Sequence, residues 1–204
     1  MEPDNVLNVA VYSATVASGI GAPVALWRSN ISGRGQGSHT HVAVGNLNNN
    51  RTADIVISLL QADGTTAQMI LLEYQANFQQ GSGANLSQNL RERATATYFV
   101  GTGNVGPKDL QMTLVDLSGS GQDRVALAWD QAGGLGGLSP TLSLRTFDVQ
   151  TINGTVQFVN REQWSTQSNS LSFALAAGDI NGDHRDELVV GYDVRATAST
   201  ACSM

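Results

Sequence analysis

Oxygen-bearing side chains are concentrated in one short stretch near the end of this chain. In GDINGDHRDELVVG, residues 178–191, they are Asp179, Asn181, Asp183, Asp186 and Glu187. The first three alternate along the chain, so in a curled loop their oxygens turn toward a common centre, as in sites that bind hard cations such as Ca²⁺. A metal-free hairpin closed by Asx turns fits the same spacing. The stretch by itself leaves both interpretations open.

The stretch is not an EF-hand. That motif requires a Glu at position twelve and a helix on each side of the loop. Counted from Asp179, position twelve is Val190, which belongs to an apolar, β-branched run. The run predicts a strand directly after the loop.

The same pattern occurs twice more along the chain. GNLNNNRTADIVI begins at Gly45 and VDLSGSGQDRVAL begins at Val115, and both align without a gap with the stretch from Gly178. The first oxygen-bearing residues, at position one of each window, are Asn46, Asp116 and Asp179. Each window follows an apolar run and enters an aliphatic run at position ten. The windows start 70 and 63 residues apart (115 − 45 and 178 − 115). Windows that recur at such intervals predict a repeat protein built from four-stranded units.

The segments between the windows have the pattern of strands. Apolar runs such as 54–61 and 123–130 are separated by turn signals, and the Asp-Gly pair at 63–64 and the Asn-Gly pair at 153–154 favour tight hairpins. A phase slip within 144–147 predicts a β-bulge. The closest approach to a helical stripe lies in 89–99, where a short helix is the alternative to a strand. The predicted fold class is all-β.

Composition supports this fold class and excludes some functions. Gly accounts for 22 of 204 residues, and charged residues for only 14%, against the usual quarter or so. The formal net charge is -6 and Lys108 is the only lysine, which argues against a nucleic-acid partner or an anionic membrane surface. No apolar run approaches the ~20 residues of a transmembrane helix, so no membrane insertion is expected.

Cysteine usage and the N-terminus bear on the compartment. Cys202 is the only cysteine, so the fold cannot depend on an intrachain disulfide and must depend on packing or on metal. The first residues, MEPDN, lack the basic and apolar regions of a secretory signal. We expect either a cytosolic protein or a piece of a longer secreted chain.

The pattern of an apolar strand followed by G-D-x-N-G-D-x-x-D/E-L-V-V-G resembles the FG-GAP or VCBS repeat of integrin α-chain propellers and many bacterial extracellular proteins. Residues 178–191 match it closely, and the other two windows match in outline. The resemblance implies four-stranded antiparallel blades arranged radially, with the acidic loop joining the first two strands of each blade. It also implies structural Ca²⁺ on one face of the propeller.

The resemblance assigns the ligands of the third window. Asp179, Asn181 and Asp183 would bind the ion together with the backbone carbonyl of Arg185 and the carboxylate of Glu187. At position six the family usually has Gly, whereas this chain has His, a residue that tolerates the left-handed conformation better than most. We interpret this histidine, His184, as a turn residue, because imidazole is a poor ligand for Ca²⁺.

The other two windows are weaker candidates for metal. The first window offers oxygens from Asn46, Asn48, Asn50 and Asp54. Only one of them is a carboxylate, so the charge of a cation is poorly compensated.

In the second window the oxygens of Asp116, Ser118 and Ser120 are followed by Arg124 at position nine, where an acid is needed. We expect that guanidinium to replace the cation by pairing with Asp116.

Counting strands from the loops gives a domain organisation of one propeller segment over residues 1–204. Its predicted parts are a half-blade at 1–37, a blade at 38–107, a blade at 108–170 and a half-blade at 171–204. About three blades' worth of repeats is too few for a closed ring of four to eight blades. We expect a segment of a larger propeller, or two chains that meet in one ring, with self-association through open edges as a further possibility.

The expected function is a non-catalytic binding, adhesion or scaffold module. Calcium-stabilised blades would present loops to a protein or glycan partner, outside the cell and as part of a longer secreted chain. One alternative is the non-catalytic propeller of a larger secreted hydrolase or toxin. Another is a lectin, in which Trp27, Trp129 and Trp164 stack on sugars instead of packing between blades. No catalytic motif is present, and 101–106 (GTGNVG) is interpreted as a loop because no βαβ unit surrounds it.

Overall fold

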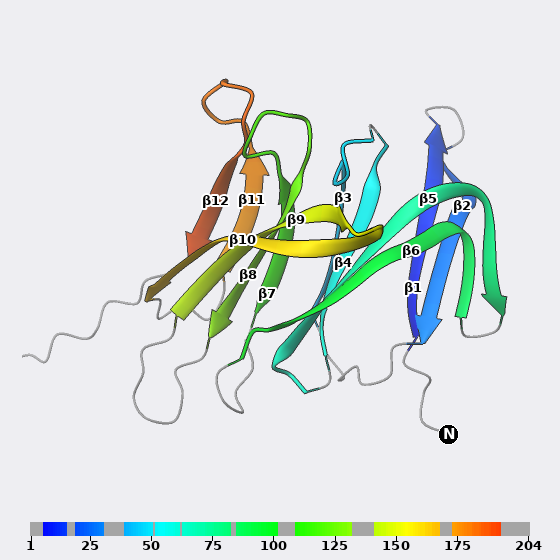
Figure 1. The fold of residues 1–204 in the computed structure, drawn as a ribbon, viewed down its shortest axis with the longest axis horizontal. Coiled ribbons are helices and arrows are strands. Elements are labelled where there is room, and N and C mark those ends of the chain that lie inside the picture. Colours follow the sequence, from blue (N-terminus) through cyan, green and yellow to red (C-terminus); the bar gives the residue numbers. More distant parts are fainter. Residues whose placement is uncertain are drawn as a thin grey trace, which may run out of the picture.

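The computed structural model describes residues 6–15, 19–30, 39–50, 52–61, 63–82, 85–101, 109–131, 141–167 and 173–192. These residues form twelve strands and no helix, so the chain is all-β (Figure 1). The strands are β1 (Val6–Thr15), β2 (Gly19–Asn30), β3 (Thr40–Gly45), β4 (Asp54–Leu60), β5 (Thr66–Ser82), β6 (Asn85–Phe99), β7 (Leu110–Val115), β8 (Arg124–Gln131), β9 (Thr141–Ile152), β10 (Thr155–Gln167), β11 (Phe173–Gly178) and β12 (Glu187–Tyr192).

Two four-stranded antiparallel meanders form the centre of the molecule. Strands β3 to β6 pair in sequence order, as do β7 to β10, and β11 pairs with β12 as a separate hairpin. The sequence windows at 46–53, 116–123 and 179–186 are the loops from β3 to β4, from β7 to β8 and from β11 to β12. Each therefore joins the first two strands of its unit, and the units have the topology of blades in a partial propeller, as predicted.

The sheets are stacked face to face, which explains why their strands are so apolar. One face of the β3–β6 sheet packs on the β1–β2 hairpin through residues such as Ile57 and Trp27. Its other face packs on the β7–β10 sheet through residues such as Leu71 and Leu127. All seven residues of β4 are buried, because a strand covered on both faces has no solvent side to fill with polar residues. The far face of the second sheet packs on Phe173 of β11.

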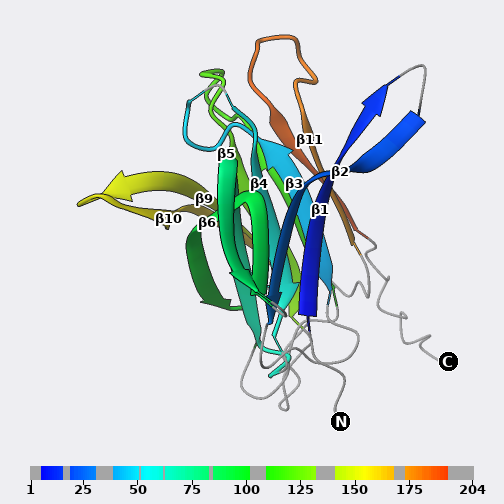
Figure 2. The same ribbon diagram turned by 90° about the vertical axis from the view of Figure 1, so that its right-hand side faces the viewer.

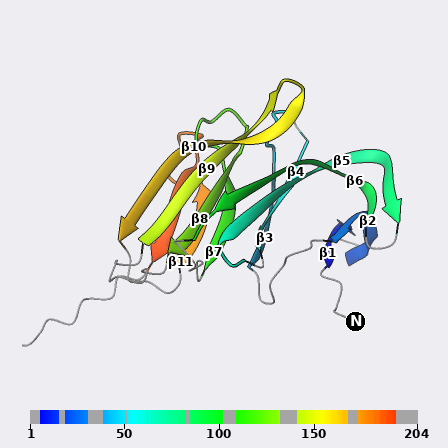
Figure 3. The ribbon, with the colours of Figure 1, turned by 60° about the horizontal axis from the view of Figure 1, so that its bottom comes forward.

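The β5–β6 hairpin extends beyond the first sheet and bends toward the N-terminal hairpin (Figures 2 and 3). There β2 pairs with β6 at Leu26 with Asn89 and at Trp27 with Ser87, so that β1 and β2 join the first unit in a six-stranded sheet. The segment 89–99, for which a short helix was the alternative, is a strand within β6. Its pairing with β5 supplies the backbone hydrogen bonds that a helix would have made internally.

The local turn predictions are confirmed, and a bulge occurs at the predicted level of the sheet but on the neighbouring strand. Gly64 has a φ of 66°, and Asn153 and Gly154 have φ values of 52° and 79°. The bulge lies opposite Thr146, where the pairing of β9 with β10 skips from Asn160 to Gln163. The extra residue is on β10, the partner of the strand in which the phase slip was read.

Candidate functional loops

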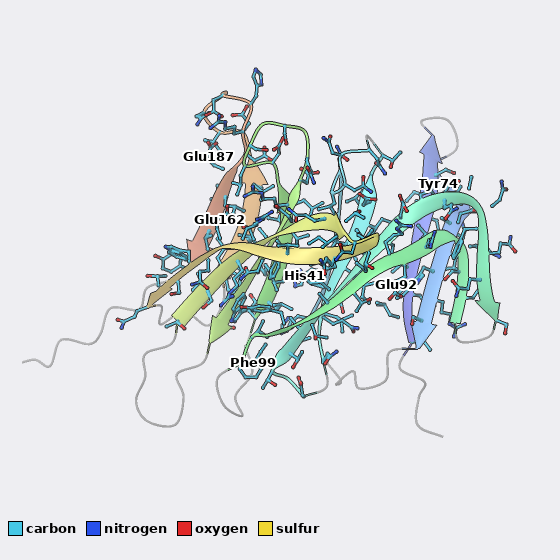
Figure 4. All side chains as sticks on the ribbon, in the orientation of Figure 1. His41, Tyr74, Glu92, Phe99, Glu162 and Glu187 are labelled. Atoms are coloured by element: carbon cyan, nitrogen blue, oxygen red, sulfur yellow. The ribbon has the colours of Figure 1, made fainter. Side chains whose placement is uncertain are left out.

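The three repeat loops gather at one end of the molecule, above the first two strands of each unit (Figure 1). We call them loop 1 (residues 46–54), loop 2 (116–124) and loop 3 (179–187), and we number the positions of each loop from one to nine. Glu187, at position nine of loop 3, is labelled in Figure 4 at this end of the molecule.

Loop 3 is organised around the carboxylate of Asp179. One oxygen accepts the backbone N–H groups of Gly182 (2.7 Å) and Asp183 (3.1 Å), and the other accepts the N–H of His184 (2.9 Å). Gly182 and His184 have φ values of 78° and 68°. The left-handed conformation expected for His184 is therefore confirmed, and it aims the N–H groups of the turn at Asp179.

The other predicted ligands of loop 3 are held in the same turn. Glu187 accepts the N–H of Ile180 (2.9 Å) on one oxygen and the side-chain amide of Asn181 (2.8 Å) on the other. Asn181 accepts the N–H of Asp183 (2.8 Å), and Asp183 accepts the N–H of Arg185 (2.9 Å). The side chains of positions one, three, five and nine all fold back onto this short loop.

The chemistry of this donor set fits a hard cation, since every ligating group is an oxygen and three of them are carboxylates. Each carboxylate oxygen that accepts one N–H keeps a further lone pair. No group of three or more His, Cys, Asp or Glu side chains spaced to hold a metal occurs among the described residues. A metal in loop 3 would therefore have to be bound by amide or carbonyl oxygens as well as by acids.

Loop 1 has the same inward-turned acid at position nine. Asp54 is fully buried and accepts the N–H of Leu47 (3.1 Å) and the side-chain amide of Asn48 (3.3 Å). Burial raises the pKa of Asp54 to about 6, against the lowering effect of the Leu47 N–H, and the nearby Glu73 raises it further. Asn48 also accepts the N–H of Asn50 (3.1 Å).

The first of the weaker metal candidates points elsewhere. The side-chain amide nitrogen of Asn46 donates to the backbone carbonyl of Gly121 in loop 2 (2.5 Å). Position one of loop 1 thus serves a contact between loops, while positions three, five and nine form a chain of bonds within the loop.

Loop 2 repeats the turn around Asp116, which accepts the N–H groups of Ser118 (3.2 Å), Ser120 (3.2 Å) and Gly121 (2.5 Å). Burial acts to raise the pKa of Asp116, but these N–H groups and the Ser118 hydroxyl outweigh it and hold the pKa below its usual value.

The expected pairing of Arg124 with Asp116 is wrong. The Arg124 guanidinium lies across its own sheet, 2.9 Å from Asp148 on β9 and 2.7 Å from Glu162 on β10. The backbone of loop 2 already satisfies Asp116. Without Arg124, the two acids beside the β-bulge would have only Arg161, which pairs with Asp148 and not with Glu162. Glu162 also bonds the Thr146 hydroxyl, so Arg124 fixes the bulge and not the loop.

Sequence reasoning missed a contact that links neighbouring loops. The N–H of Asn46 donates to the carboxylate of Asp123 (2.7 Å), and the N–H of Asp123 donates back to the Asn46 carbonyl (2.8 Å). The same reciprocal pair joins Asp116 and Asp186, with both bonds at 2.9 Å. We call this pair the clasp. It joins position one of one loop to the position-eight aspartate of the next.

The residue at position eight of each window agrees with the clasp. Aspartate occupies position eight in the second and third windows, and Ala53 occupies it in the first. Burial raises the pKa of Asp123, against the Asn46 N–H, and the negative charges of Asp116 and Asp186 raise it further. The clasp aspartates therefore add to the negative potential at this end of the molecule.

The three tryptophans and two histidines, His39 and His41, lie outside the three loops. Trp27 and Trp129 are 3% and 2% exposed and pack between sheets, while Trp164 is 45% exposed. His39 lies 3.8 Å from Asp109, and burial lowers the pKa of His41. Lys108, residues 102–106 and Cys202 lie outside the described residues.

No family model matches the chain, and neither a curated protein nor a solved structure matches it. The described residues form strands alone and so include no helix that could span a membrane.

Proposed function

We propose that this chain is a non-catalytic binding or scaffold module of the FG-GAP/VCBS type, in which loop 3 binds one structural Ca²⁺. The module would act outside the cell, as part of a longer secreted chain, and present its loops to a protein or glycan partner. The observation that carries the proposal is the inward fold of positions one, three, five and nine of loop 3. Oxygens from Asp179, Asn181, Asp183 and Glu187 lie on one turn there.

The three loops differ in what they offer a cation. Loop 3 has three carboxylates at its predicted ligand positions, which together offset the charge of Ca²⁺. Loop 1 has only the carboxylate of Asp54, and its Asn46 amide is engaged with loop 2. Loop 2 has a guanidinium at position nine. These differences favour loop 3 as the calcium site and leave Asn46, Asn48, Asn50 and Asp54 as the weaker candidate.

Bound Ca²⁺ would supply a cross-link between the two ends of the loop, and so between β11 and β12. Extracellular modules of this kind bind Ca²⁺ with dissociation constants of about 10⁻⁴–10⁻³ M, a range that suits the calcium of extracellular fluid. Asp179, which accepts three backbone N–H groups, would shape the turn, while Asp183 and Glu187 would supply most of the remaining charge.

The test is thermal unfolding of the chain with millimolar Ca²⁺ and with EGTA, beside direct calorimetric titration with Ca²⁺. At tenfold saturation, mass action predicts a stabilisation of about 1.4 kcal/mol. Glu187→Gln and Asp183→Asn keep hydrogen-bonding groups while removing charge, so each should abolish the shift and leave the calcium-free protein folded. Asp116→Asn makes the same charge change in loop 2 and should leave the shift intact. The proposal would be contradicted if Ca²⁺ neither raised the melting temperature of the wild-type protein nor bound to it in the titration.

A second candidate function is that of a lectin. Trp164 is exposed on β10 beside polar side chains, which favours a glycan as the partner. The third candidate, the propeller of a larger hydrolase or toxin, would require a catalytic domain elsewhere in the same chain.

A further inference from the structure

A groove lies at the seam between the two four-stranded units. The end of β6 forms one wall, and strands β8, β9 and β10 form the other, enclosing a volume of about 600 Å³. Phe99 at the end of β6 is labelled in Figure 4 at the opposite end of the molecule from Glu187. The groove is therefore remote from the acidic loops.

Aromatic rings line this groove at two levels. Tyr98 lies deeper, with its ring centroid 5.7 Å from that of Trp129 and 5.6 Å from that of Phe147. Phe99 and Trp164 also line the groove but are 57% and 45% exposed. Exposed rings held on strands above a packed aromatic base are flat, rigid surfaces, which is the property that binding sites use aromatic residues for.

The polar side chains of the groove are donors and neutral hydrogen-bonding groups, with no acid among them. Ser143, Gln163 and Ser165 contribute hydroxyl and amide groups. Arg145 places its guanidinium 4.7 Å from the centre of the Tyr98 ring, and it has no carboxylate partner within the described part of the chain. In a protein with a net charge of -6, this is a positively charged position that attracts an anionic ligand group.

Trp129 adds an independent observation. The side chain is 2% exposed and lines the groove, and its indole N–H is buried with no acceptor among the described residues. A buried donor without a partner costs about 1–3 kcal/mol, and in native proteins such a group calls for a bound water or ligand as its explanation. Trp129, one of the residues that line the groove, therefore carries a buried donor that the described residues leave unsatisfied.

We propose that this groove binds a saccharide that carries a carboxylate, of the uronic-acid class. The C–H face of a sugar ring packs on Trp164 and Phe99, the carboxylate pairs with Arg145, and hydroxyls bond the neutral side chains. The stacked guanidinium is preorganised for this role, because Tyr98 limits its rotamers. The inference rests on the proposed binding function and deepens it by naming the ligand class and its site.

The test uses a tetrasaccharide of alternating glucuronate and N-acetylglucosamine, and its carboxyl-reduced form as the neutral control. Calorimetric titration and tryptophan fluorescence report binding to the whole chain. Trp164→Ala and Arg145→Gln should each weaken binding of the acidic tetrasaccharide at least tenfold, and Arg145→Gln should abolish the preference over the reduced form. Tyr74 is a similarly exposed aromatic residue outside the groove, so the Tyr74→Ala variant should bind like the wild type.

Three results would overturn the saccharide site: no binding by the wild type at millimolar concentration, equal binding of the acidic and reduced forms, or binding unaffected by both groove variants. The titrations are run in Ca²⁺ and in EGTA, at a temperature where circular dichroism shows a folded chain. If the chain binds the saccharide but its melting temperature is the same in Ca²⁺ and in EGTA, only the calcium site is refuted. If Ca²⁺ raises the melting temperature of a chain that binds no saccharide, only the saccharide site in the groove is refuted.

Discussion

The loops that begin at Asp116 and Asp179 follow the same backbone course. In both, the carboxylate at position one accepts the N–H groups of positions five and six, and the residues at positions four and six have positive φ. The loops separate at position nine. Glu187 turns back into loop 3, whereas Arg124 turns outward to the acids of β9 and β10.

This difference shows that one turn geometry can serve two purposes. The turn depends on the acid at position one, which both loops have. Position nine then decides what else is held: an acid returns to the loop and concentrates negative charge, as Glu187 and Asp54 do, while an arginine leaves the loop and bonds the acids at the bulge, as Arg124 does. Changes at position nine and at the clasps should separate these two roles.

Replacing Arg124 by an acid should cause the largest loss of stability. Arg124→Glu removes the cation that bonds both Asp148 and Glu162, leaving only Arg161 beside Asp148. It also adds a third negative charge beside the two acids. We expect the free energy of unfolding to fall by about 3 kcal/mol, because two partly exposed ion pairs, each worth about 1 kcal/mol, are replaced by repulsive contacts; urea denaturation measures it. The matched change in loop 3, Glu187→Gln in EGTA, should cost under about 1 kcal/mol. Comparable losses in the two variants would show that position nine is not the point of difference.

The acid at position nine of loop 1 should give the chain a pH dependence. The pKa of Asp54 is raised to about 6 in the folded protein, above its usual value, so the folded state holds this proton more tightly than the unfolded state. Its contribution is therefore favourable at low pH and is lost as pH rises from about 4 to 7, by up to about 3 kcal/mol. Asp54→Asn should remove this loss of stability, measured by denaturation from pH 4 to pH 7. If the variant lost as much free energy of unfolding between pH 4 and pH 7 as the wild type, Asp54 would not be the group responsible.

The clasp between loops 1 and 2 requires a glycine before loop 1. A Cβ at Gly45 would collide with the carboxylate of Asp123 and lie 2.7 Å from Leu114, so Gly45→Ala should cost about 2 kcal/mol. The equivalent residue before loop 3 is Gly178, where a Cβ would meet no atom within 4 Å. Gly178→Ala should leave the melting temperature unchanged or slightly raised. Equal effects at the two sites would mean that the clasp does not constrain the approach of the loops.

The clasp between loops 2 and 3 should give the smallest effect. Asp186→Ala removes the acceptor of the Asp116 N–H, which should lower the free energy of unfolding by about 1 kcal/mol. Asp186→Asn retains a carbonyl oxygen in the same place and should stay within about 0.5 kcal/mol of the wild type. A larger loss in the asparagine variant would indicate that the charge, and not the hydrogen bond, is what matters.

The local features of the chain could be predicted from the order of its residues. The strands, the hairpin turns at 63–64 and 153–154 and the left-handed His184 all follow from interactions between residues a few positions apart. The windows also placed the three loops correctly between the first two strands of their units. Short-range patterns suffice here because backbone conformation and apolar periodicity are properties of neighbouring residues.

Which distant groups meet depends on the packing of the whole fold. It gave Arg124 its partners on β9 and β10 instead of Asp116, joined β2 to β6, formed the clasps between loops, and assembled the groove from strands of two units. Each of these contacts joins residues that are far apart in the chain, and each depends on how the sheets stack. Stacking is driven by burial of apolar area, which is non-directional, so the sequence pattern shows that a face will be covered without showing which polar groups will meet at its edges.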